Sequence, residues 1–231
     1  MTRTTVLVPS HNEALTIRAV IADVRARIDR VIVIDDGSTD GSADLLADMD
    51  VTVVRHDTNA GKGHRLVEGL ELAFSEGADQ VLTLDGDGQH DPASIDDFLQ
   101  AAALYPDAMI IGDRFSQKAR MPAHRLLANA FGSFFISWAC VRQIRDAQCG
   151  MRLYPAKFWK DVRVPDNQIE RFKFETAALL YAAKAGIWIS TVPIDARYEG
   201  YVHRPSHFAP VADFFQLFGL VTKFLFAQRL Q

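Results

Sequence analysis

The sequence has few cysteines and no long apolar segment. Only 2 of its 231 residues are cysteine, too few for the disulfide framework of a small secreted domain. The longest stretch without a charged residue, 126–141, contains Asn129 and two serines, and it is shorter than the roughly 20 apolar residues of a spanning helix. The first residues also lack the pattern of a signal peptide. These absences predict a cytoplasmic protein with free thiols, Cys140 and Cys149, and no transmembrane helix.

The sequence also lacks a large excess of charge of either sign. A net charge of -4 and a pI of about 6.0 exclude the basic field that nucleic acid requires. Hydrophobic residues at 48% and charged residues at 23% are typical of a folded globular chain, and the length suits one domain over 1–231. Acidic residues are missing from 114–145, which makes this segment suited to bind phosphate. Its cations are Arg114, Lys118, Arg120, Arg125, Arg142 and Arg145.

Strand and helix patterns alternate over the first half of the chain. Expected strands span 4–9, 30–36, 51–56, 80–85 and 108–113, and expected helices span 13–27, 40–47, 61–76 and 92–104. The strand cores are continuous apolar runs, as in Val31 to Ile34, which is typical of strands covered on both faces. The alternation predicts an α/β fold with a mostly parallel central sheet flanked by helices.

The second half begins with a basic loop after Asp113. We expect helices at 123–141 and 174–185, strands at 151–154 and 187–194, and a Phe-rich amphipathic helix over 208–231. Its apolar residues recur at helical spacing: Phe214, Phe218, Val221 and Leu225. Such a stripe usually packs in a core. Docking on a membrane surface stays open, because an interfacial helix needs only an apolar face and flanking cations.

Two carboxylates one residue apart, Asp85 and Asp87, follow the expected strand 80–85. Gly86 and Gly88 favour a tight turn there. Ligands of open α/β sheets bind at the carboxyl ends of strands, and carboxylate oxygens suit a hard divalent cation. A solvated turn is the alternative, because the pattern is short.

Three other loops fall at the same edge of the expected sheet. Residues 8–13 leave polar groups free after a proline, and 35–42 offer Asp36 to a base or ribose. Ser10 and Asp40 could instead only cap helices. The third loop, 59–63, places Lys62 and free backbone N–H groups at a helix start, which suits a phosphate. The P-loop pattern is absent.

These motifs together resemble family 2 glycosyltransferases, and most of all the dolichol-phosphate or polyprenol-phosphate mannosyltransferase branch. The matching stretches are VPSHNE at 8–13, VIDDGSTD at 33–40, NAGKG at 59–63, LDGDGQHDP at 84–92, IGDR at 111–114, DAQCGMRLY at 146–154 and FE at 174–175. The resemblance implies a GT-A fold in one domain, with a nucleotide-sugar and metal half at 1–113 and an acceptor half at 114–207.

The resemblance also implies roles for individual residues. The donor would be bound by Pro9, Ser10, Asn12, Glu13, Asp36, Lys62, Asp85 and Gly86. Asp85, Asp87 and Gln89 would hold Mg²⁺ or Mn²⁺, with His207 as a further candidate. The acceptor would be bound by Arg114, Arg120, Arg125 and Asn129. Asp87 and Arg114 are the residues expected to act in catalysis.

The expected reaction moves a sugar, with inversion, from a nucleotide diphosphate sugar of the GDP-mannose or UDP-glucose type to a polyprenyl phosphate at the membrane surface. A phosphate acceptor needs no general base. A hydroxyl acceptor would need one, and Glu175 and Asp146 are the candidates. The segment 199–208 has histidine at 207 where the branch usually has lysine, which keeps the hydroxyl acceptor open.

Two rival functions also stay open, a nucleotidyltransferase and a non-catalytic module that binds nucleotide sugars. The sequence leaves the oligomeric state undecided. It also leaves undecided whether the protein sits on the inner face of a membrane.

Overall fold

A mixed seven-stranded sheet forms the centre of the protein, with strand order β3-β2-β1-β4-β6-β5-β7. The computed structural model describes residues 2–115, 123–170 and 173–195, and also 219, 221, 222 and 224. The strands are β1 (Thr4–Ser10), β2 (Arg30–Asp35), β3 (Thr52–Arg55), β4 (Gln80–Thr83), β5 (Met109–Asp113), β6 (Arg152–Pro155) and β7 (Ile189–Pro193). β6 is antiparallel to β4 and β5, and the other strand pairs are parallel. The predicted α/β class is confirmed.

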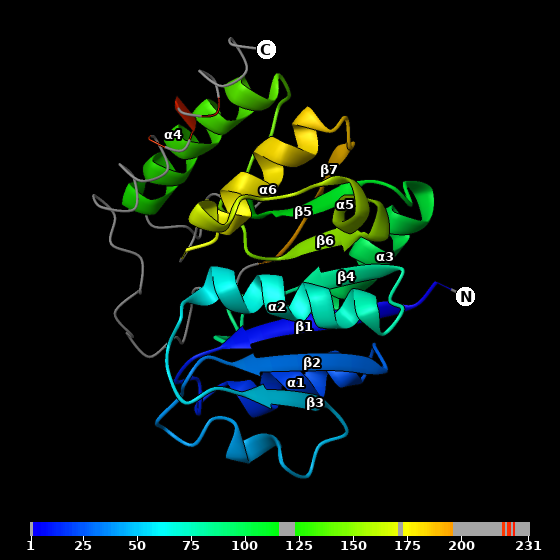
Figure 1. Cartoon of the computed structure of the whole chain (residues 1–231), viewed down its shortest axis with the longest axis vertical. Helices are drawn as coiled ribbons and strands as arrows, with labels where there is room; N and C mark the ends of the chain where they lie inside the picture. The colour runs from blue at the N-terminus through cyan, green and yellow to red at the C-terminus, as the bar shows by residue number, and fades with distance from the viewer. Residues whose placement is uncertain are drawn as a thin grey trace.

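Helices cover both faces of this sheet (Figure 1). They are α1 (Ile17–Arg25), α2 (Lys62–Ser75), α3 (Ile95–Leu104), α4 (Ala123–Cys140), α5 (Ala156–Asp161) and α6 (Lys173–Lys184). α2 lies in front of the sheet and α1 behind it, while α4 lies at the end near β7 and packs on α6. Over the described ranges, no helix is both long and apolar enough to cross a bilayer.

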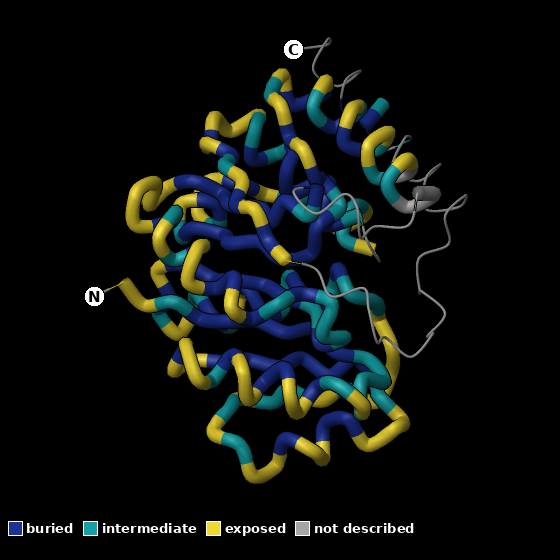
Figure 2. Tube along the Cα trace, turned by 180° about the vertical axis from the view of Figure 1, so that it is seen from behind, coloured by how far each residue is buried: buried dark blue, intermediate teal, exposed yellow. Residues whose placement is uncertain are grey.

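The core lies between the sheet and its helices (Figure 2). Val6, Leu7 and Val8 of β1 are fully buried, and the run from Val31 to Ile34 in β2 is almost fully buried. Consecutive residues of a strand point to opposite faces, so burial of every residue requires cover on both sides. The continuous apolar runs in the sequence therefore indicate that these strands lie in the centre of the sheet.

The sheet reverses its winding between β1 and β4. From β1 the chain proceeds through β2 to the outer strand β3, and α2 then carries it back to β4 on the other side of β1. The loops after β1 and β4 consequently leave the same edge side by side. Such a reversal point is where open α/β sheets bind ligands.

Several predicted boundaries are wrong. The helix expected at 40–47 is only the 3-10 turn η1 (Asp44–Leu46). Asp40 instead accepts hydrogen bonds from the backbone N–H groups of the nearby Ser42 and of Ala14, which is 26 residues away in sequence, and this side-chain bonding competes with a helix. The first helix begins at Ile17 rather than at residue 13, and no sequence pattern predicted the short helix α5.

The end of the chain contributes at least two residues to the core. Val221 and Phe224 are buried, and the Phe224 ring lies 5.6 Å from that of Tyr181 in α6. This burial agrees with a core role for these two positions. Phe214, Phe218 and Leu225 lie outside the described residues.

Gly69 lets α2 approach β1 closely, and replacing it by valine should destabilise the fold. A Cβ at this position would lie 2.2 Å from Leu7 Cδ1, so we expect Gly69→Val to lower the free energy of unfolding by about 1–3 kcal/mol through overpacking. Urea unfolding measures this change. Glu71→Val on the exposed face of α2 is the control and should change stability by less than about 0.5 kcal/mol. Adding Leu7→Ala to Gly69→Val should recover part of the loss, and a purely additive loss would contradict the packing argument.

Candidate active site

Asp85 and Asp87 lie on the loop that leaves the carboxyl end of β4. The Asp85 carboxylate is 2.7 Å from Lys62 Nζ, at the first residue of α2. Asp87 Oδ1 accepts the backbone N–H of Gln89 at 2.9 Å, which closes a turn over Gly88, whose φ is 72°. The two carboxylates are therefore fixed on one turn, at the reversal point of the sheet.

The same surroundings act on these two acids in opposite directions. Burial alone would raise the pKa of Asp85, but the Lys62 ammonium outweighs it and lowers the pKa to about 2. Burial raises the pKa of Asp87 to about 6, and repulsion by Asp85 adds to this. Lys62 contacts Glu175 at 3.1 Å as well, and these two carboxylates overcome its burial and raise the pKa of its ammonium.

His90 and Gly150 both lie next to Asp85. The backbone N–H of Asp85 donates to His90 Nδ1 at 3.4 Å, and burial lowers the pKa of this histidine to about 4, so that it is neutral at pH 7. A Cβ at Gly150 would lie 2.7 Å from Asp85 Oδ2 and 3.0 Å from Lys62 Nζ. Only glycine leaves room for the ion pair. The sequence analysis did not identify either role, because no local sequence pattern indicates them.

Arg152 of β6 organises the loop 146–150 beside the site. The residue is 1% exposed, and its guanidinium donates to the backbone carbonyls of Cys149 and Ala147, each at 2.7 Å, and to that of Glu175. These bonds connect the loop 146–150 to the first turn of α6. The structure thereby sets Gly150 and Glu175 against Lys62.

The loop after β1 is bonded to the loop after β2. Asn12 has a φ of 57°, its backbone N–H donates to Ser38 Oγ, and its side-chain oxygen accepts the N–H of Thr39, both at 2.8 Å. The N–H of Glu13 donates to Ser42 Oγ at 2.8 Å. Pro9 and Ser10 are buried at the end of β1, and Ser10 Oγ has no hydrogen-bond partner within the described part of the chain.

The loop after β1 also touches the loop after β4. Thr16 Oγ1 donates to the carbonyl of Gly86 at 2.8 Å, and a Cβ at Gly86 would lie 3.0 Å from Ile17 Cδ1 and 3.7 Å from Glu13 Cγ. The predicted donor residues from β1 and β4 are thus brought together.

Asp36 holds the loop that precedes α2. Its two carboxylate oxygens accept the backbone N–H groups of Ala60 and Gly61 at 2.8 and 2.9 Å, and the Arg65 guanidinium at 2.7 Å. Burial opposes its charge, but these donors lower its pKa. At Gly37 a Cβ would come within 2.8 Å of the Thr58 backbone. The sequence suggested that Asp36 faces a base or ribose. In the structure its oxygens bond to the protein and set the approach of Lys62.

Arg114, which the sequence predicts to bind the acceptor, is held by a buried acid. Arg114 Nε and Nη2 donate to the two oxygens of Asp146 at 2.7 and 2.9 Å, and Asp146 is 0% exposed. The carboxylate thus fixes the plane of the guanidinium. Asn129 lies half-buried on α4, which packs on the same loop: a Cβ at Gly132 would lie 2.6 Å from Gln148 Nε2. Arg120, His207 and the side chain of Arg125 lie outside the described residues.

The residues present fit a divalent cation that shares its shell with a ligand. No group of three or more His, Cys, Asp or Glu side chains gathers at a metal-binding distance within the ranges described. Mg²⁺ sites of enzymes that bind phosphates commonly use one or two carboxylates and complete the shell with water and phosphate oxygens. Asp85 and Asp87, with the amide of Gln89, supply such a set. Burial and repulsion by Asp85 raise the pKa of Asp87, and a bound cation would relieve that repulsion.

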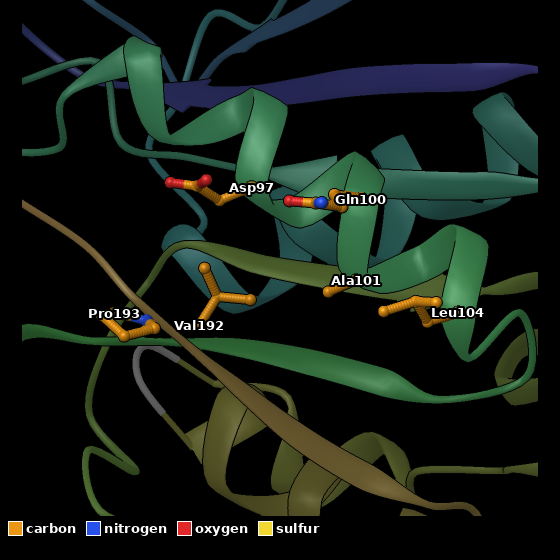
Figure 3. Close-up of a pocket in the computed structure, with 6 residues that line it drawn as sticks. All are labelled: Asp97, Gln100, Ala101, Leu104, Val192 and Pro193. Atoms are coloured by element: carbon orange, nitrogen blue, oxygen red, sulfur yellow. The ribbon is translucent and has the colours of Figure 1, made fainter.

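A shallow groove of about 360 Å³ lies between α3 and β7 (Figure 3). Its walls are formed by Asp97, Gln100, Ala101, Leu104, Val192 and Pro193. None of these is a predicted site residue, and the groove contains one acid and no cation. Its chemistry does not match that of a nucleotide or phosphate ligand.

Replacing the two aspartates by asparagine should change stability in opposite directions in metal-free buffer. At pH 7.5, Asp87→Asn removes a disfavoured charge and should raise the free energy of unfolding by about 1–2 kcal/mol. Asp85→Asn leaves Lys62 with one partner fewer and should lower it by about 1–3 kcal/mol.

The pH dependence follows from the shift at Asp87. Its folded pKa of about 6 lies above the ordinary 3.8, so the cost of its charge is complete above pH 6. The gain from Asp87→Asn should shrink as the pH falls from 6 towards 3.8. Urea unfolding with EDTA at several pH values measures both variants. A change of the same sign for both at pH 7.5 would contradict the electrostatic account.

Comparison with known proteins places this geometry in a family. The sequence profile of Glycosyl transferase family 2 matches residues 5–157. The chain is 27% identical to the UDP-N-acetylglucosamine--dolichyl-phosphate N-acetylglucosaminyltransferase of Methanococcus voltae, over 84% of this chain and 86% of that protein. It is also 27% identical to the polyprenol monophosphomannose synthase of Mycolicibacterium smegmatis, over 83% of this chain and 76% of that protein.

Solved structures share the fold. The glucosyl-3-phosphoglycerate synthase of Mycobacterium tuberculosis in complex with UDP superposes with a TM-score of 0.69 at 18% identity, over 96% of this chain and 80% of that one. The same enzyme with Mn²⁺, UDP and phosphoglyceric acid gives a TM-score of 0.67. The predicted GT-A fold is confirmed. The profile match covers most of the chain, including both aspartates, and the chain belongs to the family 2 glycosyltransferases.

Proposed function

We propose that this glycosyltransferase moves a sugar, with inversion and with a divalent cation, from a nucleoside diphosphate sugar to a polyprenyl phosphate. The proposal rests on the presence of both negatively and positively charged side chains at one site. Asp85 and Asp87 offer carboxylates on the side of β4, and Arg114 offers a fixed guanidinium on the side of β5.

The donor side is supported by position and charge. The carboxylates stand at the reversal point of the sheet, and Lys62 at the start of α2 is suited to a diphosphate. A solved neighbour of the same fold holds Mn²⁺ and UDP. Asp85, Asp87 and Gln89 would bind the cation, which when bound supplies Lewis-acid stabilisation of the leaving diphosphate.

A phosphate acceptor is supported by the fact that the two acids that could serve as general bases are both paired with cations. Asp146 is fully buried and bonded to Arg114 through both oxygens. Glu175 is buried against Lys62. A hydroxyl acceptor would need one of them unpaired, whereas a phosphate acceptor is already an anion and needs a cation for placement. The two named relatives carry dolichyl phosphate and polyprenol monophosphomannose in their names.

The proposed chemistry is a single displacement at the anomeric carbon. An oxygen of the acceptor phosphate forms the new bond to that carbon while the bond to the donor diphosphate breaks, and the electron pair leaves with the nucleoside diphosphate. Attack from the face opposite the leaving group inverts the configuration. No proton is transferred. Arg114 would orient the acceptor, and Asp146 would keep the guanidinium in its plane.

We further propose that α4 provides the contact with the membrane. Leu127, Phe131, Phe134 and Trp138 of α4, and Val141 after it, are each at least half exposed and follow helical spacing. Two of them are Phe and one is Trp, which are residues of the bilayer interface. The segment 114–145 contains six cations and no acid, which suits an anionic lipid surface. The same segment contains Arg114 and Asn129, so the membrane would lie beside the acceptor.

Asp87→Ala should abolish transfer while the protein stays folded. With Mn²⁺, the wild type should release a nucleoside diphosphate only when a short-chain polyprenyl phosphate is added to one of GDP-mannose, UDP-glucose or UDP-N-acetylglucosamine. The variant should be at least about 100-fold slower, because it lacks one of the two carboxylates.

The control for this assay is Asp96→Ala, which removes an exposed acid of α3 and should leave the rate unchanged. Full activity of Asp87→Ala would contradict the role of this acid. Transfer to a hydroxyl-bearing lipid but not to the phosphate would contradict the acceptor.

Phe134→Ser with Trp138→Ser should weaken binding to vesicles that contain anionic phospholipid by about tenfold or more, because two interfacial aromatic side chains are lost. Vesicle co-sedimentation measures this. Transfer to a water-soluble, short-chain acceptor should be unchanged. Tyr105→Ser, at an exposed aromatic residue after α3, is the control and should bind like the wild type. A dimer in solution that the double variant dissolves would instead assign this face to a second copy of the chain.

A further inference from the structure

Three charged side chains from separate parts of the sequence meet at one point of the site. Lys62 Nζ lies 2.7 Å from Asp85 Oδ1 and 3.1 Å from Glu175 Oε1. The three side chains are between 8% and 29% exposed. Gly150 closes the cluster from the side, with no room for a Cβ. Lys62 is therefore held between two acids in a partly desolvated space.

The position of Lys62 conflicts with the proposed use of Asp85. An ammonium at 2.7 Å already neutralises the oxygen Oδ1 of this carboxylate. A divalent cation on the same carboxylate would lie within a few ångströms of that ammonium, where like charges repel strongly at the reduced dielectric of a buried site. Asp85 cannot serve both cations fully, so Lys62 must leave Asp85 before the carboxylate can ligate a metal.

The surroundings of Lys62 offer it a second set of partners. It is the first residue of α2, its loop is fixed by Asp36, and the proposed diphosphate would lie at this helix start. The lysine stem is flexible enough to turn its ammonium towards phosphate oxygens. Glu175 lies on α6, apart from the loop that carries Asp85, so its contact with the ammonium does not depend on the contact to Asp85.

We propose that Lys62 is an internal counter-ion of Asp85: it occupies this carboxylate in the free protein and transfers to the donor diphosphate, so that metal and donor bind together and the metal alone binds weakly. The inference rests on the proposed donor and metal roles of the site, and it adds that donor and metal bind cooperatively. Glu175 is the positioning residue that holds Lys62 within reach of both partners.

The proposed transfer of Lys62 from Asp85 to the diphosphate has a thermodynamic consequence. If the donor releases Asp85 for the metal, a nucleoside diphosphate must raise the affinity for the metal, and the metal must raise the affinity for the nucleoside diphosphate by the same factor. Contact between phosphate oxygens and the metal produces part of this coupling in any such site. The part that passes through Lys62 should vanish when the lysine is removed.

The test compares Mn²⁺ binding without nucleotide in the wild type, in Lys62→Met with Glu175→Gln, and in Glu175→Gln alone. The double variant removes one positive and one negative charge, so the net charge of the site is unchanged and no unpaired acid is created at 175. Mn²⁺ binding is measured by electron paramagnetic resonance of the free ion and by calorimetry, and circular dichroism checks the fold.

We expect the double variant to bind Mn²⁺ about tenfold more tightly than the wild type, within the roughly 5–150-fold range of coupled sites. Glu175→Gln alone retains Lys62 and should show no gain. The factor by which UDP or GDP strengthens Mn²⁺ binding should be smaller in the double variant than in the wild type.

Equal or weaker Mn²⁺ binding by the double variant would overturn the inference, whatever the nucleotide does. The proposed function fails on a different result, which is a wild-type protein that binds no nucleoside diphosphate with Mn²⁺ present. Because the first measurement uses the metal alone, the two failures are distinguishable.

Discussion

The site depends on one buried guanidinium that has no carboxylate partner among the residues that the structure describes. Arg152 lies in the central part of the sheet and is compensated by three backbone carbonyls, from 147, 149 and 175. A buried charge is tolerated only where its hydrogen bonds are made, so these carbonyls are held where the guanidinium needs them. The loop 146–150 and the start of α6 are thereby fixed to β6. Through that loop Asp146 reaches Arg114, and through α6 Glu175 reaches Lys62.

The electrostatics of the site reflect a compromise between stability and the proposed binding of a cation. Asp85 is stabilised as an anion by Lys62, while Asp87, two residues away, is left with a pKa raised to about 6 by burial and by its neighbour. Repulsion between neighbouring acids is a common feature of sites that bind cations, and proteins tolerate it where function requires it. The neutral His90 beneath Asp85 fits the same arrangement, because a second positive charge there would weaken the attraction of the acids for a cation.

Much of the fold could be read from the sequence, since local signals and the global fold agree in the first half. Continuous apolar runs identified β1, β2 and β4, and the turn residues after them placed Asp85 and Asp87 at the carboxyl edge. The sequence could not give the reversed direction of β6 or the failure of a helix at 40–47, because both depend on contacts with distant segments. The contact between Lys62 and Glu175 spans 113 residues, and periodicity carries no information at that range. The sequence suggests Glu175 as a candidate base or as a buried structural acid, and only the packing of α6 shows that its partner is Lys62.

The reversed strand β6 also constrains how the chain can fold. It lies between β4 and β5, which are both complete before residue 114 is made, yet it comes from residues 152–155. The first half cannot close its own sheet, and the apolar edge of β4 stays open until later residues arrive. Unpaired strand edges invite association with other chains, and long-range pairing of this kind slows folding. During synthesis the nascent chain therefore remains dependent on its later half, because only the short strand β6 joins the part of the sheet that ends at β4 to the part that contains β5 and β7.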